Sequence, residues 1–134
     1  MRSTEQMKAY FEKDRFAAAV GARLITVSPG YAEARLMIRE DHFNAVGLVQ
    51  GGVIFTLADF AFTAAANAHG KAAIALNVNV SFVRPGIRGA LTAVARETAR
   101  SRTIGNYDVT VSDQKGKTVA LFHGTVFIRK LNIP

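Results

Sequence analysis

The chain has 134 residues, of which 49% are hydrophobic and 20% charged, and it contains no cysteine. We therefore expect a single domain over residues 1–134, without disulfides, thiolate metal sites or a cysteine nucleophile, and a cytoplasmic location. The net charge of +7 is uneven, because residues 71–134 hold ten basic and three acidic side chains whereas residues 1–70 hold seven of each. A basic half of this kind suits a phosphorylated ligand, a nucleic acid or an anionic membrane surface, unless it is simply a solvated face.

The first forty residues predict a helix followed by a hairpin. Charged side chains interrupt the N-terminal segment before any apolar run develops, so we expect no signal peptide. Its apolar residues predict an amphipathic N-terminal helix over about residues 4–19, with Ser3 or Thr4 as the cap. Residues 21–40 are typical of two strands joined by the turn Ser28-Pro29-Gly30.

A long apolar helix is predicted next. Gly51-Gly52 opens a segment with apolar residues at helical spacing, which ends near Gly70. The segment is apolar on nearly all sides, as is typical of a buried helix. Because it is short for a membrane span and is interrupted by Asp59, we expect no transmembrane segment.

The second half alternates with a period of two, which predicts strands. The expected strands cover residues 74–85, 90–101, 103–113 and 117–130. In the last of them, Val119, Leu121 and Phe127 are expected to share one face. Two strands, a buried helix and four further strands predict an α+β domain in which an antiparallel sheet wraps one helix.

Asp59 is the only formally charged side chain between His42 and Gly70. An ionised carboxylate in an apolar environment is costly unless it is paired or hydrogen-bonded. Asp59 is therefore either a structural acid, satisfied by backbone donors or by an arginine of the sheet, or a general base or nucleophile in a dry pocket.

The glycine pair at the start of the same helix offers a second chemical feature. The first N–H groups of a helix have no intrahelical acceptor, and with no side chains in the way they suit the developing oxyanion of an attacked carbonyl. Alternatively, the glycines only permit close packing or a tight turn. Eight residues separate Gly51 from Asp59, about 12 Å along a helix. If both are catalytic, they must come from different subunits.

Other chemistries find less support in the sequence. His42, His69 and His123 lack metal-ligand spacing, so we expect no metal site. No nucleophile elbow, dinucleotide-binding turn or Walker A loop is present. The basic residues are not interleaved with stacking aromatics, which disfavours nucleic-acid binding.

Residues 44–59, NAVGLVQGGVIFTLAD, contain the motif N-x(2)-G-x(3)-G-G-x(6)-D. Together with SFVRPGIRGALTAVARE and YDVTVSDQKGKTVALFHGTVF, this motif resembles the hotdog-fold acyl-CoA thioesterases of the phenylacetic acid degradation type. The resemblance implies a hotdog core over about residues 21–130, with the N-terminal helix as an addition. It also implies a homodimer paired edge to edge through residues 73–84, usually as a dimer of dimers, that is, a homotetramer.

The resemblance also implies roles for residues of the motif. Asp59 would be the catalytic base or nucleophile, and the N–H of Gly51 from the partner subunit would polarise the thioester carbonyl. Asn44 would orient water or the acid, and Thr63 would add a hydroxyl one turn after Asp59. Gln50 stands at a position where this type often has histidine. Its side chain can still form hydrogen bonds, but it cannot titrate as an imidazole does.

The remaining implied residues contact the substrate. Arg102 and Thr103 would bind the nucleotide end of CoA, with Arg84 behind them, and Phe43 and Phe55 would contact the acyl group. The expected reaction is hydrolysis of an aryl or medium-chain acyl-CoA, through water activation or an anhydride, without a metal or redox cofactor. The alternatives are a non-catalytic protein that binds acyl-CoA or an aromatic ligand, and a basic nucleic-acid-binding module. We expect neither a nucleic acid nor a membrane as partner.

Overall fold

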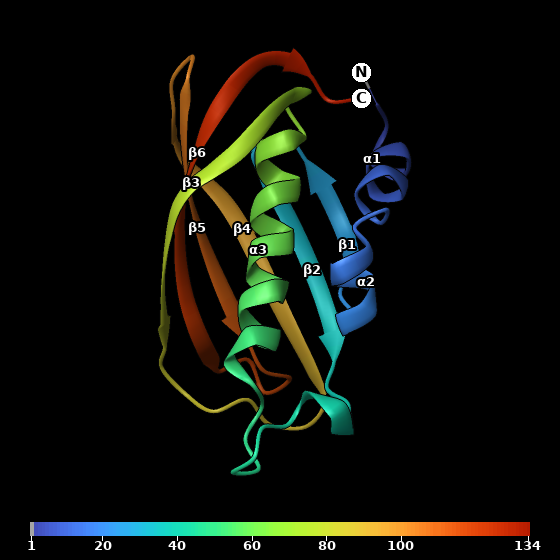
Figure 1. The fold of residues 1–134 in the computed structure, drawn as a ribbon, viewed down its shortest axis with the longest axis vertical. Helices are drawn as coiled ribbons and strands as arrows, with labels where there is room; N and C mark the ends of the chain where they lie inside the picture. Colours follow the sequence, from blue (N-terminus) through green and yellow to red (C-terminus); the bar gives the residue numbers. More distant parts are fainter. Residues whose placement is uncertain (1) are drawn as a thin grey trace.

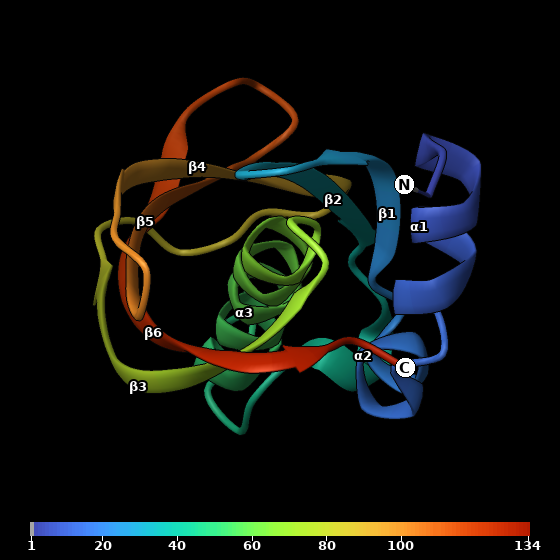
Figure 2. The same cartoon turned by 90° about the horizontal axis from the view of Figure 1, so that it is seen from above.

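The computed structural model describes residues 2–134, which form one antiparallel six-stranded sheet around a central helix. In chain order the elements are α1 (Thr4–Phe11), α2 (Arg15–Val20), β1 (Arg23–Ser28), β2 (Tyr31–Met37), η1 (Glu40–His42), α3 (Gly51–Asn67), β3 (Lys71–Phe82), β4 (Ala90–Arg100), β5 (Ile104–Ser112) and β6 (Thr118–Asn132). The strand order is β1-β2-β4-β5-β6-β3. The sheet curls around α3, while α1 packs on β1 and α2 on α3 (Figure 1, Figure 2). The α+β hotdog architecture is therefore confirmed.

The core forms where the sheet meets α3. The fully buried ring of Phe62 lies 5.7 Å from the ring of Tyr107 and 5.4 Å from that of Phe122, measured between centroids. A Cβ atom added at Gly124 would lie 2.5 Å from the Phe62 ring, so glycine lets β6 approach the helix this closely. No helix within residues 2–134 is both long enough and apolar enough to cross a membrane.

The N-terminal segment differs from the single helix expected over residues 4–19. Ser3 caps α1 as predicted, but this helix ends at Phe11. A second helix starts because the side chain of Asp14 accepts a hydrogen bond from the N–H of Ala17, 3.0 Å away. The prediction of one helix was therefore wrong, and Asp14 lies at a corner between two short helices.

The end of α3 also differs from the prediction. The helix stops at Asn67 rather than near Gly70. The Asn67 side chain accepts a hydrogen bond from the N–H of Ala73 at 2.9 Å and donates one to the carbonyl of Thr63 at 2.9 Å. These bonds fasten the start of β3 to the last turn of the helix.

One predicted strand face was wrong. Val119 is buried as expected, but Leu121 and Phe127 are half exposed on the opposite face of β6. The pairing of β5 with β6 shifts by one residue between Val111 and Ser112, and this irregularity reverses the facing of the residues that follow.

β3 lies at an edge of the sheet. Among the strands of residues 2–134 it pairs only with β6, and its other side has no hydrogen-bonding neighbour. Its side chains include three exposed apolar ones, Ile74 at 52%, Leu76 at 57% and Phe82 at 51%. A long unpaired edge with apolar side chains is typical of a strand that joins another chain.

Candidate active site

A narrow stripe of α3 faces out of the fold. Gly52, Thr56, Asp59 and Thr63 are partly or fully exposed, whereas most residues between them are buried. Their spacing of three or four residues places them on one side of the helix. The structure thus brings the predicted Asp59 and Thr63 together, one turn apart, on the accessible face of the core helix.

The carboxyl group of Asp59 lacks a stabilising partner. Burial raises its pKa, and the negative charge of Asp14 raises it further, with no opposing contribution from a hydrogen bond or a cation in residues 2–134. A purely structural acid would need such a partner. A carboxylate with a raised pKa and unused oxygen atoms is instead suited to remove a proton or to attack an electrophile.

The N-terminus of α3 presents a backbone donor. The side chain of Gln50 caps the helix by accepting a hydrogen bond from the N–H of Gly52 at 3.2 Å. The N–H of Gly51 has no acceptor in the described chain. Phe82 covers the Cα of Gly51, where an added Cβ atom would lie 3.3 Å from the ring. The donor of Gly51 is therefore available to a ligand oxygen at the positive end of the helix.

Asn44 shapes the loop before this helix. Its side-chain oxygen accepts hydrogen bonds from the N–H groups of Val46 at 3.1 Å and Leu48 at 3.0 Å. Its amide nitrogen makes no hydrogen bond within residues 2–134, so it remains a donor. Asn44 and Gly51 line one cleft of about 330 Å³. The amide nitrogen of Asn44 can therefore donate to a ligand in this cleft, as orienting a carboxylate or a water requires.

His42 is a residue whose role the sequence did not reveal. Its ring is buried, with Nε2 lying 2.8 Å from the carbonyl of Val20 and Nδ1 accepting from the N–H of Arg39 at 3.0 Å. Its own carbonyl accepts a hydrogen bond from the N–H of Gln50 at 2.8 Å. His42 therefore connects the end of α2 to the cap of α3, which a lone loop histidine in a sequence does not indicate.

The substrate-binding candidates separate into two regions. Arg102 and Thr103 lie at the β4–β5 turn, near the C-terminal end of α3 (Figure 1). Arg84 instead lines the cleft with Asn44 and Gly51 and donates to the carbonyl of Thr118 at 2.8 Å. Within one chain, Arg84 is thus grouped with the helix N-terminus and not with Arg102.

Arg102 and Thr103 line a strongly basic groove. The groove has a volume of about 350 Å³, and its cationic members are Lys71, Arg100, Arg102, Arg129 and Lys130. Half of the ten basic residues in the second half of the chain gather here. Such a concentration of positive charge suits a ligand with several phosphates.

The two phenylalanines expected near the acyl group already have partners in the chain. The guanidinium of Arg88 lies 4.8 Å from the ring centre of Phe43. The ring of Phe55 meets that of Phe122 edge to face at 5.6 Å. Both residues are partly buried at the margin of the core.

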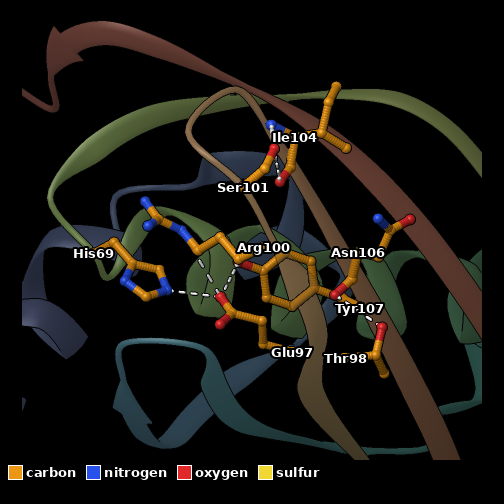
Figure 3. Close-up of polar contacts among 8 residues, drawn as sticks. All are labelled: His69, Glu97, Thr98, Arg100, Ser101, Ile104, Asn106 and Tyr107. Carbon is orange, nitrogen blue, oxygen red and sulfur yellow. Dashed lines mark hydrogen bonds and ion pairs between the residues drawn. The ribbon is translucent and has the colours of Figure 1, made fainter.

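A polar cluster joins the end of α3 to the sheet. Figure 3 shows Glu97 between His69 and Tyr107, with distances of 2.7 Å and 2.8 Å to its Oε1 atom. Burial alone would raise the pKa of Glu97, but the bonds from His69 and Tyr107 and the charge of Arg100 outweigh burial and lower it. Arg100 also lines the basic groove, so the cluster supports one wall of that groove.

No three histidine, aspartate or glutamate side chains come together as a metal site in the part of the chain that the structure describes. Among the predicted catalytic residues, the Gly51 N–H, the Asn44 amide nitrogen and the Asp59 carboxyl have no partner within residues 2–134. Gly51 and Asp59 are separated by eight residues of one helix, about 12 Å.

Known proteins resemble this chain in sequence and in structure. The family model of the thioesterase superfamily matches residues 46–120. The acyl-coenzyme A thioesterase PaaI of Escherichia coli is 36% identical over 124 residues, which cover 92% of this chain and 89% of that protein. Its structure matches with a TM-score of 0.89 over 94% of this chain and 92% of that one. A mutant form of the phenylacetic acid degradation protein PaaI of Thermus thermophilus is 39% identical with a TM-score of 0.81, covering 85% and 98% of the two chains.

These matches extend well beyond the motif, and the structural agreement covers both the sheet and its central helix. The chain therefore belongs to the thioesterase superfamily, as a hotdog-fold acyl-CoA thioesterase of the phenylacetic acid degradation type.

Proposed function

We propose that the protein hydrolyses acyl-CoA thioesters to a carboxylic acid and CoA at a site built from two copies of the chain. The observation that carries this proposal is that Gly51 and Asp59 each have an unused functional group, yet lie about 12 Å apart along α3. One carbonyl group cannot reach both within a single chain. Pairing of two β3 edges about a two-fold axis would cover the exposed apolar residues and supply the missing group from the second copy.

In this mechanism the N–H of Gly51 donates to the thioester oxygen and stabilises the negative charge that develops there. Asp59 of the other copy either removes a proton from the attacking water or attacks the carbonyl carbon to form an anhydride, which water then hydrolyses. The sulfur of CoA leaves in both routes. The amide nitrogen of Asn44, which has no partner in residues 2–134, would orient water or the carboxylate.

The basic groove is the proposed site of the nucleotide end of CoA. Arg102 and Thr103 line it together with four further cationic side chains. Arg84 would reach the same ligand only from the second copy. The E. coli relative comes from the phenylacetic acid degradation operon, so aryl acyl groups are the first to test. We further expect a dimer of dimers in the cytoplasm.

The test is a panel of aryl and medium-chain acyl-CoAs assayed for thiol release, with Asp59→Asn as the variant. We expect the wild-type protein to release thiol. The kcat of the variant should be lower by a factor on the order of 10² to 10⁴. Unchanged turnover of the variant would refute the role of Asp59. Tight binding of every acyl-CoA without thiol release would instead support the non-catalytic alternative.

A further inference from the structure

Residues 42–50 form a loop whose two ends are joined by a backbone hydrogen bond. The carbonyl of His42 accepts this bond from the N–H of Gln50 at 2.8 Å. Asn44 lies inside the loop, and Gly51 follows it directly. Two groups of the proposed site are therefore held by the closure of one loop, and His42 lies at its base.

The direction of the Gly51 N–H depends on how the preceding residue, Gln50, is held. The carbonyl of Gln50 accepts a hydrogen bond from the N–H of Val53 at 3.0 Å, and its side chain accepts one from the N–H of Gly52 at 3.2 Å. Both bonds lie within the first turn of α3 and move with it. Among residues 2–134, the carbonyl of His42 is the only group outside this turn that bonds Gln50. His42 therefore fixes the peptide that carries the Gly51 N–H relative to the rest of the fold.

The buried imidazole of His42 is itself fixed at both nitrogen atoms. Its Nδ1 accepts a hydrogen bond from the N–H of Arg39 at 3.0 Å. A backbone N–H can only donate, so the ring proton is on Nε2, which donates to the carbonyl of Val20 at 2.8 Å. The first bond spans three residues and the second spans 22. Only the second bond ties the loop to a separate element, the C-terminal end of α2.

The end of α2 is a firm anchor for this bond. Ala17, in the middle of the helix, is buried in the core. The guanidinium of Arg39 donates to the carbonyl of Ala19 at 2.9 Å. Gly21 ends the helix with a φ of 99°, and a Cβ atom there would lie 2.9 Å from Nη1 of Arg39, so glycine leaves room for this contact. The last carbonyls of α2, which no N–H of the helix can reach, thus hold the segment that leads into the loop.

Resting on the proposed thioesterase function, we propose that His42 is a positioning residue whose bond to the end of α2 directs the Gly51 N–H at the thioester oxygen. A donor stabilises an oxyanion only when it points at the place that this oxygen takes in the transition state. A misplacement of about 1 Å can cost on the order of 10² in rate. His42 does not touch the substrate, so loss of its bond should lower kcat and leave KM within about twofold.

The test is a double-mutant cycle between His42 and Gly51, assayed by thiol release from acyl-CoA. We expect His42→Leu to lower kcat about tenfold in the wild-type chain but less than about threefold in the Gly51→Pro chain, where the donor is already absent. A loss of stability alone would lower kcat by the same factor in both chains. Val27→Ala is the matched control, because it opens a cavity at a buried position of β1 and should leave kcat unchanged. Equal factors for His42→Leu in the two chains would overturn the inference.

Two conservative variants keep the inference testable if His42→Leu does not fold. The amide nitrogen of glutamine can take the place of Nε2 and donate to Val20, whereas the amide oxygen of asparagine can take the place of Nδ1 and accept from Arg39. We expect His42→Gln to keep kcat within about threefold of the wild type and His42→Asn to lower it about tenfold, because only glutamine retains the bond to α2. Equal kcat values for the two variants, or a higher value for His42→Asn, contradict the proposed role.

The amide resonance of Gly51 separates this inference from the proposed function, because it reports the surroundings of the donor without any turnover. We expect this resonance to shift in the nitrogen–proton NMR spectrum of His42→Leu and His42→Asn but not in that of Val27→Ala. If the wild type releases no thiol and the resonance shifts as expected, the thioesterase proposal fails and the positioning inference stands. If thiol release is intact and the resonance does not shift, the positioning inference fails and the proposed function stands.

Discussion

Gly51→Pro tests the backbone donor of the proposed site directly. Gly51 is the first residue of α3, a position that tolerates proline because its N–H has no intrahelical acceptor. Gln50 has φ −59° and ψ 130°, the extended conformation that a residue before proline prefers. The substitution should therefore remove one N–H and leave the helix in place. Gly51→Ala is the matched control, because it keeps the N–H and adds the same Cβ atom near Phe82.

The expected magnitude follows from the donor that is lost. Removing one oxyanion donor costs on the order of 10² to 10³ in kcat, so Gly51→Pro should be slower than Gly51→Ala by that factor. The contact with Phe82, 3.3 Å from the added Cβ, should affect both variants alike. Thiol release from acyl-CoA gives kcat, and urea unfolding verifies that both variants fold. If Gly51→Pro turns over within about threefold of Gly51→Ala, the N–H of Gly51 does not polarise the carbonyl.

The same variant tests whether the site is shared. When Gly51→Pro and Asp59→Asn chains are unfolded together and refolded, about half of the dimers should be mixed, each with one site free of both substitutions. Activity should then return to about one quarter of the wild-type level. No recovery would show that Gly51 and Asp59 act within one chain, which the helix spacing argues against.

Three further predictions concern charge and stability. Asp59→Asn should stabilise the fold at pH 7, because burial raises the pKa of the carboxyl in the folded state. The gain in unfolding free energy should shrink as the pH falls from that raised pKa through about 4, the pKa of an unfolded aspartate. Urea titrations at pH 7 and below about pH 4 measure the difference. Tyr107→Phe should cost about 1.5 kcal/mol of unfolding free energy through the lost bond to Glu97. Because the pKa of Glu97 is lowered, this loss should be present above about pH 4.3 and fade as the pH falls through the lowered value. Arg102→Ala should raise KM about fivefold for acyl-CoA but not for acyl-pantetheine, whereas Lys115→Ala should change neither.

The parts of the site that depend on helical spacing could be predicted from the sequence. A helix apolar on nearly all sides must be buried, and a single carboxylate in it stands out. The period of 3.6 residues also places Asp59 and Thr63 on one face, and the glycine pair marks the free end. These inferences need only neighbours along the chain, and the structure agrees with each of them.

The parts that depend on contacts between distant segments could not be predicted. Glu97 bonds His69, which lies 28 positions before it in the sequence, and Tyr107, which lies 10 positions after it. No local sequence pattern connects these residues. The facing of Leu121 changed because of one irregular pair between strands, and a single inserted residue has no signature in alternation. Similarly, the cap at Asp14 divided a segment whose composition alone favours one helix.

The features that make an isolated chain unfavourable are the same ones that the proposed reaction needs. β3 exposes apolar side chains along an unpaired edge, and Asp59 holds a carboxyl in a partly buried position without a partner. In the proposed dimer, pairing of the two edges covers the apolar side chains and brings the donor end of the second α3 toward the carboxyl. Formation of this one interface would thus cover the apolar edge and give the carboxyl a neighbour. The carboxyl would stay reactive, because that neighbour is the substrate rather than a cation.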